Sequence, residues 1–469
     1  MGKSKTPSFI IELPLITNSK QAQVLNSRFE AGRQAYNACL GEAIKRRGQM
    51  LRSKLYRSAL ILPKGAAKSR AFQKAKKDYG FSEYSLHDYV QKIRDSWIGK
   101  HIDSMTAQSL ATRAFNAVNK TVTGDAENVW FKRYDTLDSL EGKKNSSGIR
   151  WRDGKVIWNT GNDLELRVII NKTDPVIAYG LSCPVKYVRI VKQIIRGKTR
   201  YYVQLILKGK PYQKKKNYVT AGETGLDLGP SSLAEVGDTE ANLHLFCHEL
   251  DDTQKQIRVL QRQMDRQRRA NNPDNYNPNG TIKKGKHIWK NSARHLKTKA
   301  RVAELHRRQA AHRKSLHGRL VNDMLRRGNE FYLEDVSHKA WQKRFGKSVN
   351  YRAPGLFVSS LKRKVETVGQ SLTKFPTNGT ALSQMCQCGR KEKKKLSERW
   401  HKCSCGVSVQ RDLYSAFLAR HVKTNNSINY YLDTGSAIKE WPMLNSFFDN
   451  AIEDAYKKYP YKPPSSFGL

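Results

Sequence analysis

Four of the seven cysteines fall within twenty residues and repeat one short pattern, Cys-x-Cys-Gly. Four thiolates satisfy tetrahedral zinc without leaving a position for water, which is typical of a structural site. The glycine after each pair suits the tight turn of a zinc knuckle, although the one-residue gap within each pair is shorter than the usual two. A tight cluster also favours a metal over disulfides. We therefore predict one structural Zn²⁺, held by Cys386, Cys388, Cys403 and Cys405.

One histidine, His401, lies between the two cysteine pairs and is an alternative ligand. Because four thiolates already complete a tetrahedral site, we expect this histidine to pack in the interior or to contact phosphate instead.

The chain is strongly basic, with 86 Lys and Arg against 41 Asp and Glu and a formal net charge of +45 over 469 residues. Charge of one sign on this scale repels itself in a compact chain, and a phosphate backbone is the natural partner to neutralise it. The excess is concentrated in two helical stretches, with a net of +10 over residues 41–80 and +14 over residues 251–330. We find no apolar run of membrane-spanning length, no lipidation signal and no signal-peptide core. These observations predict a cytoplasmic nucleic-acid-binding protein without a membrane partner.

The chain length predicts two or three domains, and the pattern of apolar and polar residues differs between them. A short strand over residues 8–13 precedes a long helical region, in which Ser85 is expected to cap a helix that reaches Trp97. Beyond residue 150, apolar and polar residues alternate, and Val185–Ile195 and Tyr201–Leu207 predict a hairpin within a barrel or sandwich.

Three acids are expected where strands or helices begin or end: Asp227, Glu334 and Asp412. Two-metal phosphodiester hydrolysis needs such a set, because two Mg²⁺ ions about 4 Å apart require hard oxygen ligands and a bridging carboxylate. In an RNase H-like fold, distant acids meet on neighbouring strands and a closing helix. Asp335 competes with Glu334, and only one of the two should face the metals, since neighbouring strand residues point to opposite faces. We expect Gly225 and Gly229, which flank Asp227, to let substrate approach the backbone closely.

In this order, these elements resemble the TnpB proteins encoded by bacterial insertion sequences and their relatives, the compact type V CRISPR effectors. The resemblance spans about residues 120 to 420. Its motifs are Gly225-Leu226-Asp227-Leu228-Gly229, Leu333-Glu334-Asp335, the four cysteines, Arg411-Asp412, the helical stretch 251–330 and Trp130-Phe131-Lys132-Arg133.

The resemblance implies a multidomain α+β fold. Its N-terminal part is a wedge-like β-barrel with a helical recognition insert, and its C-terminal part is an RNase H-like (RuvC) α/β domain with an inserted zinc ribbon. The expected ranges are 1–15 for the first barrel strand, 16–135 for the recognition lobe, 136–218 for the rest of the barrel, 219–380 for the RuvC-like domain with its helical insert 251–330, 381–408 for the zinc ribbon, 409–425 for the last RuvC segment and 426–469 for a tail of unknown role.

The function that the resemblance implies is RNA-guided DNA cleavage. A noncoding guide RNA pairs with the target strand of double-stranded DNA beside a short motif read by the protein. Asp227, Glu334 and Asp412 then correspond to the catalytic ligands of two Mg²⁺ ions. Such a protein acts in the prokaryotic cytoplasm on nucleoid DNA, and its oligomeric state is left open.

Besides the shortened cysteine pairs, two departures from the family stand out: Gln410 replaces a frequent acid, and Tyr414-Ser415 replace an expected Asn-Ala. Three alternatives follow. The first is a compact type V CRISPR effector, which only the neighbouring DNA would distinguish. The second is an RNA-guided DNA-binding repressor that does not cut. The last is a strand-transfer transposase, which the sequence favours least because the tyrosine or acid cluster that it needs is not evident.

Overall fold

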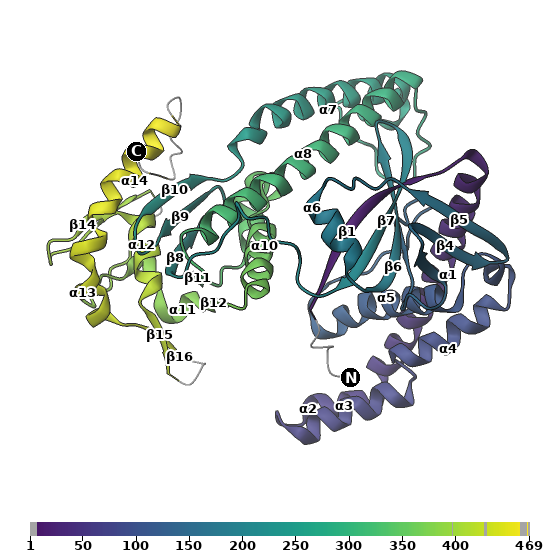
Figure 1. Ribbon diagram of the computed structural model, residues 1–469, viewed down its shortest axis with the longest axis horizontal. Coiled ribbons are helices and arrows are strands. Elements are labelled where there is room, and N and C mark those ends of the chain that lie inside the picture. The colour runs from purple at the N-terminus through teal and green to yellow at the C-terminus, as the bar shows by residue number, and fades with distance from the viewer. Residues whose placement is uncertain (1–6, 396, 426–428, 460–466, 468–469) are drawn as a thin grey trace. The chain divides into compact units, whose positions relative to one another are not determined.

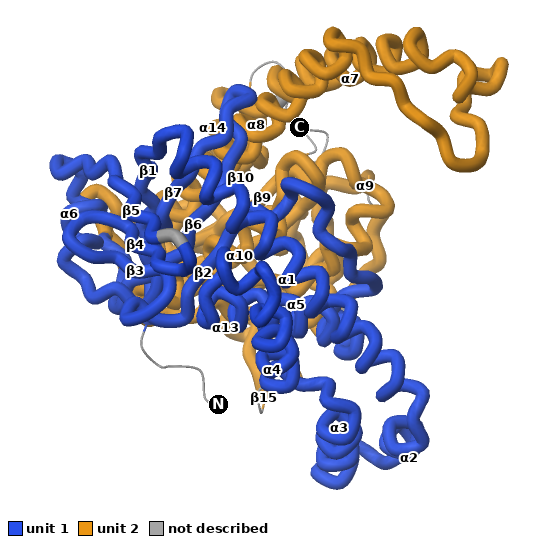
Figure 2. Tube along the Cα trace, turned by 90° about the vertical axis from the view of Figure 1, so that its right-hand side faces the viewer, with its two compact units in different colours: residues 1–212 blue, residues 213–469 orange. Residues whose placement is uncertain are grey.

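The computed structural model describes residues 7–395, 397–425, 429–459 and 467. The chain forms two compact units, Met1–Tyr212 and Gln213–Leu469, which are coloured separately in Figure 2. The sequence placed the start of its last large domain a few residues later, at 219. Both units combine helices and strands, so the chain is a multidomain α+β protein, as predicted.

The first unit is built on an antiparallel sheet with the strand order β2-β6-β7-β1-β5-β4-β3. Every second side chain of β1 from Phe9 to Leu15 is buried, as expected for a strand with one face on the core. The predicted hairpin is confirmed as β6 and β7, joined by Arg196 and Gly197, which both have positive φ, as a tight two-residue turn requires. The strands are β1 (Ser8–Ile16), β2 (Ser139–Glu141), β3 (Ile149–Arg152), β4 (Lys155–Thr160), β5 (Asn162–Val168), β6 (Val185–Ile195) and β7 (Lys198–Lys208).

Helices α1, α4 and α5 of this unit pack on one another, and α1 and α5 also contact the sheet (Figure 1). The expected cap at Ser85 was wrong, because Ser82 caps α4 by accepting a hydrogen bond from the Ser85 amide at 3.2 Å. Trp97 lies in the separate short helix η1. The helices are α1 (Ser19–Arg52), α2 (Lys54–Ile61), α3 (Ala66–Asp78), α4 (Glu83–Arg94), η1 (Trp97–Lys100), α5 (Ser104–Thr123) and α6 (Pro175–Ser182).

The second unit contains a five-stranded sheet with the order β10-β9-β8-β11-β12. Its first three strands, β8 (Glu223–Leu228), β9 (Ser232–Val236) and β10 (Ala241–Leu245), form an antiparallel meander. Strand β11 (Glu330–Glu334) is parallel to both β8 and β12 (Leu372–Phe375). Parallel neighbours end at the same edge of a sheet, so the ends of β8 and β11 lie side by side.

The stretch between β10 and β11 is a helical hairpin of α7 (Asp251–Asn271) and α8 (Ala293–Leu325), which pack on each other. Within the second unit, this hairpin extends away from the sheet (Figure 2). In the connection between the two helices, the Asn277 amide donates to the Thr281 carbonyl at 2.8 Å.

The sheet of this unit is also contacted by α10 (Pro354–Thr367) and α12 (Arg411–Arg420). The remaining elements are α9 (His338–Arg352), α11 (Thr377–Thr380), the hairpin β13 (Trp400–Lys402) and β14 (Ser408–Gln410), and the hairpin β15 (Val422–Asn425) and β16 (Asn429–Leu432). Three further short helices are η2 (His248–Leu250), η3 (Pro273–Asn275) and η4 (Leu382–Gln384).

The C-terminal segment is part of the core of the second unit. Helix α14 (Ser446–Lys458) packs on β10, and α13 (Thr434–Leu444) packs on α14. The Tyr459 hydroxyl accepts a hydrogen bond from the Leu245 amide at 3.1 Å. The tail, whose role could not be predicted from the sequence, therefore covers one edge of the sheet.

Within the described residues, none of the helices combines the length and the apolar character that a bilayer crossing needs.

Candidate active site and metal centre

Helix α12 packs directly on the central strand β8. A Cβ atom added to Gly225 would lie 1.9 Å from the Ala416 carbonyl oxygen and 2.9 Å from Cγ of Arg420. We expected the room at Gly225 to serve the substrate, and this was wrong, because the backbone of α12 fills it. The close approach brings the start of α12 to the edge where β8 and β11 end.

The three acids singled out in the sequence line a single cavity of about 1050 Å³. Asp227 comes from β8, Glu334 from the end of β11 and Asp412 from the first turn of α12. Residues from three distant parts of the sequence are thus brought together by the sheet topology and the packing of one helix.

The structure separates Glu334 from its neighbour Asp335. Glu334 faces the cavity, and its Oε1 accepts hydrogen bonds from the Leu382 amide at 3.2 Å and the Thr380 hydroxyl at 3.3 Å. Asp335 is exposed and pairs with Lys374 at 2.9 Å. The alternation of side chains along the strand accounts for the difference.

The site concentrates negative charge in a partly buried place. The pKa of Asp227 is raised well above its ordinary value by burial, and further by the carboxylates of Asp412 and Glu334. Burial also raises the pKa of Glu334 and of Asp412, although Arg411 and Arg399 oppose the rise at Asp412. A cation at this position would relieve both the repulsion and the cost of burial.

Several cationic residues of the cavity were not found from the sequence. The Arg399 guanidinium lies 3.9 Å from Asp412, and the Arg411 guanidinium lies 3.4 Å from it. Helix α9 adds Lys339, Lys343 and Arg344 to the lining. The run His338–Lys347 is basic and carries aromatic residues, and this signal could have marked it as a wall of the site.

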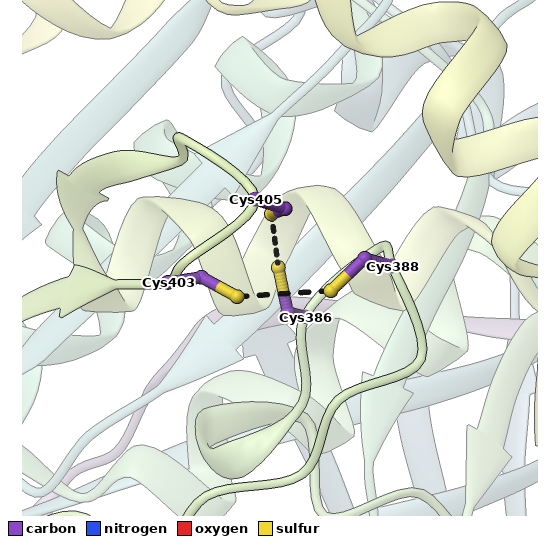
Figure 3. Close-up of side chains that lie close together, drawn as sticks. All are labelled: Cys386, Cys388, Cys403 and Cys405. Carbon is purple, nitrogen blue, oxygen red and sulfur yellow. Dashed lines mark hydrogen bonds between the residues drawn. The ribbon is translucent and has the colours of Figure 1, made fainter.

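The four cysteines converge as predicted (Figure 3). The sulfurs of Cys386 and Cys405 lie 3.5 Å apart, and those of Cys388 and Cys403 lie 3.6 Å apart. These separations approach the edge of about 3.8 Å expected for a tetrahedron with Zn–S bonds of about 2.3 Å. The set of four thiols therefore fits a structural zinc ion, and no water position is left over.

In the described part of the chain, these cysteines are the one group of three or more His, Cys, Asp or Glu side chains whose ligand atoms all lie within 4.8 Å of one another. The carboxylates of Asp227, Glu334 and Asp412 do not form such a group, although they line one cavity.

His401 does not join the cysteine cluster. Its ring is buried, with its centroid 4.5 Å from that of Tyr414, and its Nδ1 contacts the Lys394 ammonium. Burial lowers the pKa of His401 to about 4, so the ring is neutral at physiological pH. Of the two expectations for this residue, the structure favours packing.

Tyr414 connects α12 to the first cysteine pair. Its hydroxyl accepts a hydrogen bond from the Gln387 amide at 2.8 Å and lies 3.3 Å from Sγ of Cys386. Its ring makes an edge contact with Trp441 of α13 at a centroid distance of 5.3 Å. This tyrosine is one of the residues that depart from the family pattern.

Gln410, the other departure, is fully buried and caps α12. Its Oε1 accepts from the Leu413 amide at 2.7 Å, and its Nε2 donates to the Phe467 carbonyl at 3.2 Å. An acid at this position could cap the helix but would have no proton for the Phe467 carbonyl when ionised. The glutamine therefore fits the presence of the C-terminal segment.

No protein-family model matches the chain, and no curated protein matches it. Among solved structures, the chain is similar to a Cas12f1–sgRNA–target DNA complex determined by cryo-EM, with 11% sequence identity and a TM-score of 0.46 over 88% of this chain and 98% of that chain. It is also similar to a CRISPR–Cas12f ternary complex, with 11% identity and a TM-score of 0.31 over 90% of this chain and 99% of that chain.

Proposed function

We propose that this protein is a magnesium-dependent, RNA-guided DNA endonuclease of the TnpB type. The observation that carries the proposal is the meeting of Asp227, Glu334 and Asp412 in one cavity, beside a four-cysteine cluster. The assignment rests on these residues and on the sequence resemblance, and not on the likeness to the Cas12f structures.

The carboxylates suit Mg²⁺, which prefers hard oxygen ligands. Bound there, two ions would activate water and stabilise the leaving oxygen of a phosphodiester.

Different residues of the cavity would hold the ions and the phosphates of the substrate. In addition to burial, the carboxylates of Asp412 and Glu334 both raise the pKa of Asp227, and the three acids together would hold the ions. Glu334 is oriented by its two hydrogen bonds, and Asp412 by the packing of α12 on β8. Lys339, Lys343 and Arg344 also line the cavity, where their charge would hold the phosphates of a DNA strand.

The domain assignments belong to the same proposal. The strand order of the second unit, an antiparallel meander followed by two parallel strands, supports an RNase H-like (RuvC) domain. The strands of the first unit correspond to the wedge-like barrel, and its helices α1 to α5 to the recognition insert. The cysteine-bearing segment corresponds to the zinc ribbon.

The partners proposed are a guide RNA and target double-stranded DNA, which account for the formal net charge of +45. The same kinds of partner are present in the Cas12f1 complex.

The test is to express the protein with its flanking DNA, sequence the copurifying RNA, and use that RNA to programme cleavage of a target library in Mg²⁺. We expect cutting at matching sites, loss of cutting in Asp227→Ala, and retention of cutting in the matched control Asp335→Ala, whose carboxylate is exposed and outside the cavity. Absence of a discrete RNA would refute the guided model.

Two other outcomes separate the alternatives. Target binding without cleavage would favour the repressor. A repeat array next to the gene, in place of a transposon end, would favour a type V effector.

A further inference from the structure

The first turn of α12 is attached to the cysteine cluster at several points. Gln387, between the first two cysteines, donates its amide hydrogen to the Tyr414 hydroxyl at 2.8 Å. The Arg411 guanidinium donates to the Glu398 carbonyl at 2.7 Å and to the Lys395 carbonyl at 3.3 Å, both in the segment between the cysteine pairs. Asp412 lies between these two attachment residues.

Tyr414 is the attachment closest to the metal ligands. Only 1% of its surface is exposed, and its hydroxyl lies 3.3 Å from Sγ of Cys386. When Cys386 is bound to zinc as a thiolate it has no proton, so the hydroxyl must be the donor in this contact. The same oxygen accepts from Gln387, so both of its hydrogen-bonding directions are used by the knuckle.

The ring of Tyr414 leaves little freedom for movement. It lies between His401 of β13, at a centroid distance of 4.5 Å, and Trp441 of α13, at 5.3 Å. A shift of the first cysteine pair would therefore displace this side chain and, with it, the turn of α12 that bears Asp412.

We propose that Tyr414 is a positioning residue that couples zinc occupancy of the cysteine cluster to the placement of Asp412, and hence to magnesium binding in the cavity. The inference rests on the proposed function, because it takes Asp412 as a magnesium ligand. It gives the zinc cluster a regulatory effect on the active site in addition to its structural one. It also gives a reason for a tyrosine where the family pattern has asparagine.

The test uses Tyr414→Phe, which keeps the ring and removes the hydroxyl. The matched control is Tyr456→Phe, which removes the hydroxyl of an exposed tyrosine in α14. Zinc release to a chromogenic chelator should be about 10- to 100-fold faster in Tyr414→Phe than in the control, as for other residues that support metal ligands. At saturating zinc, the Mg²⁺ concentration that gives half of the thermal stabilisation should rise about fivefold or more.

Hydrogen exchange in the full-length wild-type protein provides a second measurement that needs no variant. Removal of zinc should accelerate exchange of the amides in residues 411–420, and replacement of zinc should restore it. This arm also applies if Tyr414→Phe fails to fold.

Two results would overturn the inference: zinc release from Tyr414→Phe at the control rate, or exchange in residues 411–420 that is indifferent to zinc. Faster zinc release with an unchanged Mg²⁺ dependence would also refute the coupling, since a purely structural role predicts that pattern. None of these measurements uses nucleic acid. A chain that shows the coupling but cuts no DNA would therefore refute the proposed nuclease and leave the coupling standing.

Discussion

The contact between β8 and α12 predicts that Gly225→Ala damages both stability and cleavage. The new Cβ would lie 1.9 Å from the Ala416 carbonyl oxygen, whereas an ordinary contact begins at 3.4 Å. Relief by movement of α12 alone requires a displacement of about 1.5 Å, the difference between these two distances. Because the colliding atom belongs to the helix backbone, no side-chain rotation can relieve the overlap.

The expected losses of stability and of cleavage rate can both be estimated. Overpacking of this kind costs about 3 kcal/mol of unfolding free energy, at the upper end of the usual range. A misplacement of a catalytic group by about 1 Å costs about 100-fold in rate, so the shift of Asp412 should reduce cleavage by at least that factor.

The assays are chemical denaturation of the full chain and Mg²⁺-dependent cleavage of a programmed target. The matched control is Gly318→Ala in the middle of α8, where an added Cβ meets nothing within 4 Å. That change should stabilise the protein by about 0.5–1 kcal/mol, because alanine is the better helix former. If Gly225→Ala were as stable and as active as the wild type, the close packing of α12 on β8 would be wrong.

Three further predictions concern the same unit. Mg²⁺ should raise the thermal midpoint of the wild type but not of Asp227→Asn, and an equal rise in both would exclude Asp227 as a ligand. Gln410→Glu keeps the helix cap but loses the proton donated to the Phe467 carbonyl. The unfolding free energy should therefore fall by about 1–3 kcal/mol, and proteolysis of the C-terminal segment should become faster. An unchanged proteolysis rate would contradict this prediction. Burial lowers the pKa of His317 from 6.5 to about 4, so its contribution to stability is complete above pH 6.5 and is lost as the pH falls toward 4, by up to about 3 kcal/mol. His317→Leu should flatten the pH dependence of the denaturation midpoint between pH 7 and 5, with buried His401 and His421 leaving a residual slope. An unaltered profile would refute the assignment.

The parts of the site that could be predicted from the sequence are those with a local signal. The cysteine pairs can be recognised from their spacing, and the acids can be recognised from their position at the ends of apolar strands. The separation of Glu334 from Asp335 also follows from strand alternation, once the strand is known to end at Glu334. The sequence could not choose between the two acids, because that choice depends on which face of the sheet the cavity occupies.

The parts that were missed depend on contacts between distant segments. Gly225 makes room for a helix that begins at Arg411, and no pattern near Gly225 reveals that partner. The roles of Tyr414 and Gln410 are clear only from their hydrogen bonds, which Tyr414 makes with Gln387 and Gln410 makes with Phe467. The helix cap at Ser82 is a smaller case, since Ser82 and Ser85 are both suitable caps and the local sequence does not distinguish them.

The order of the strands also has a consequence for the timing of assembly during translation. Strands β8 and β11 are hydrogen-bonded neighbours, yet the whole α7–α8 hairpin is synthesised between them. Asp412 follows later still, and the cap of its helix bonds to the carbonyl of Phe467, 57 residues further along the chain than Gln410. Because a nascent polypeptide folds from its N-terminus as it leaves the ribosome, the basic N-terminal helices emerge well before the cavity can close. For the RNA-guided nuclease proposed above, this order would let the growing chain meet RNA while it is still unable to cut DNA.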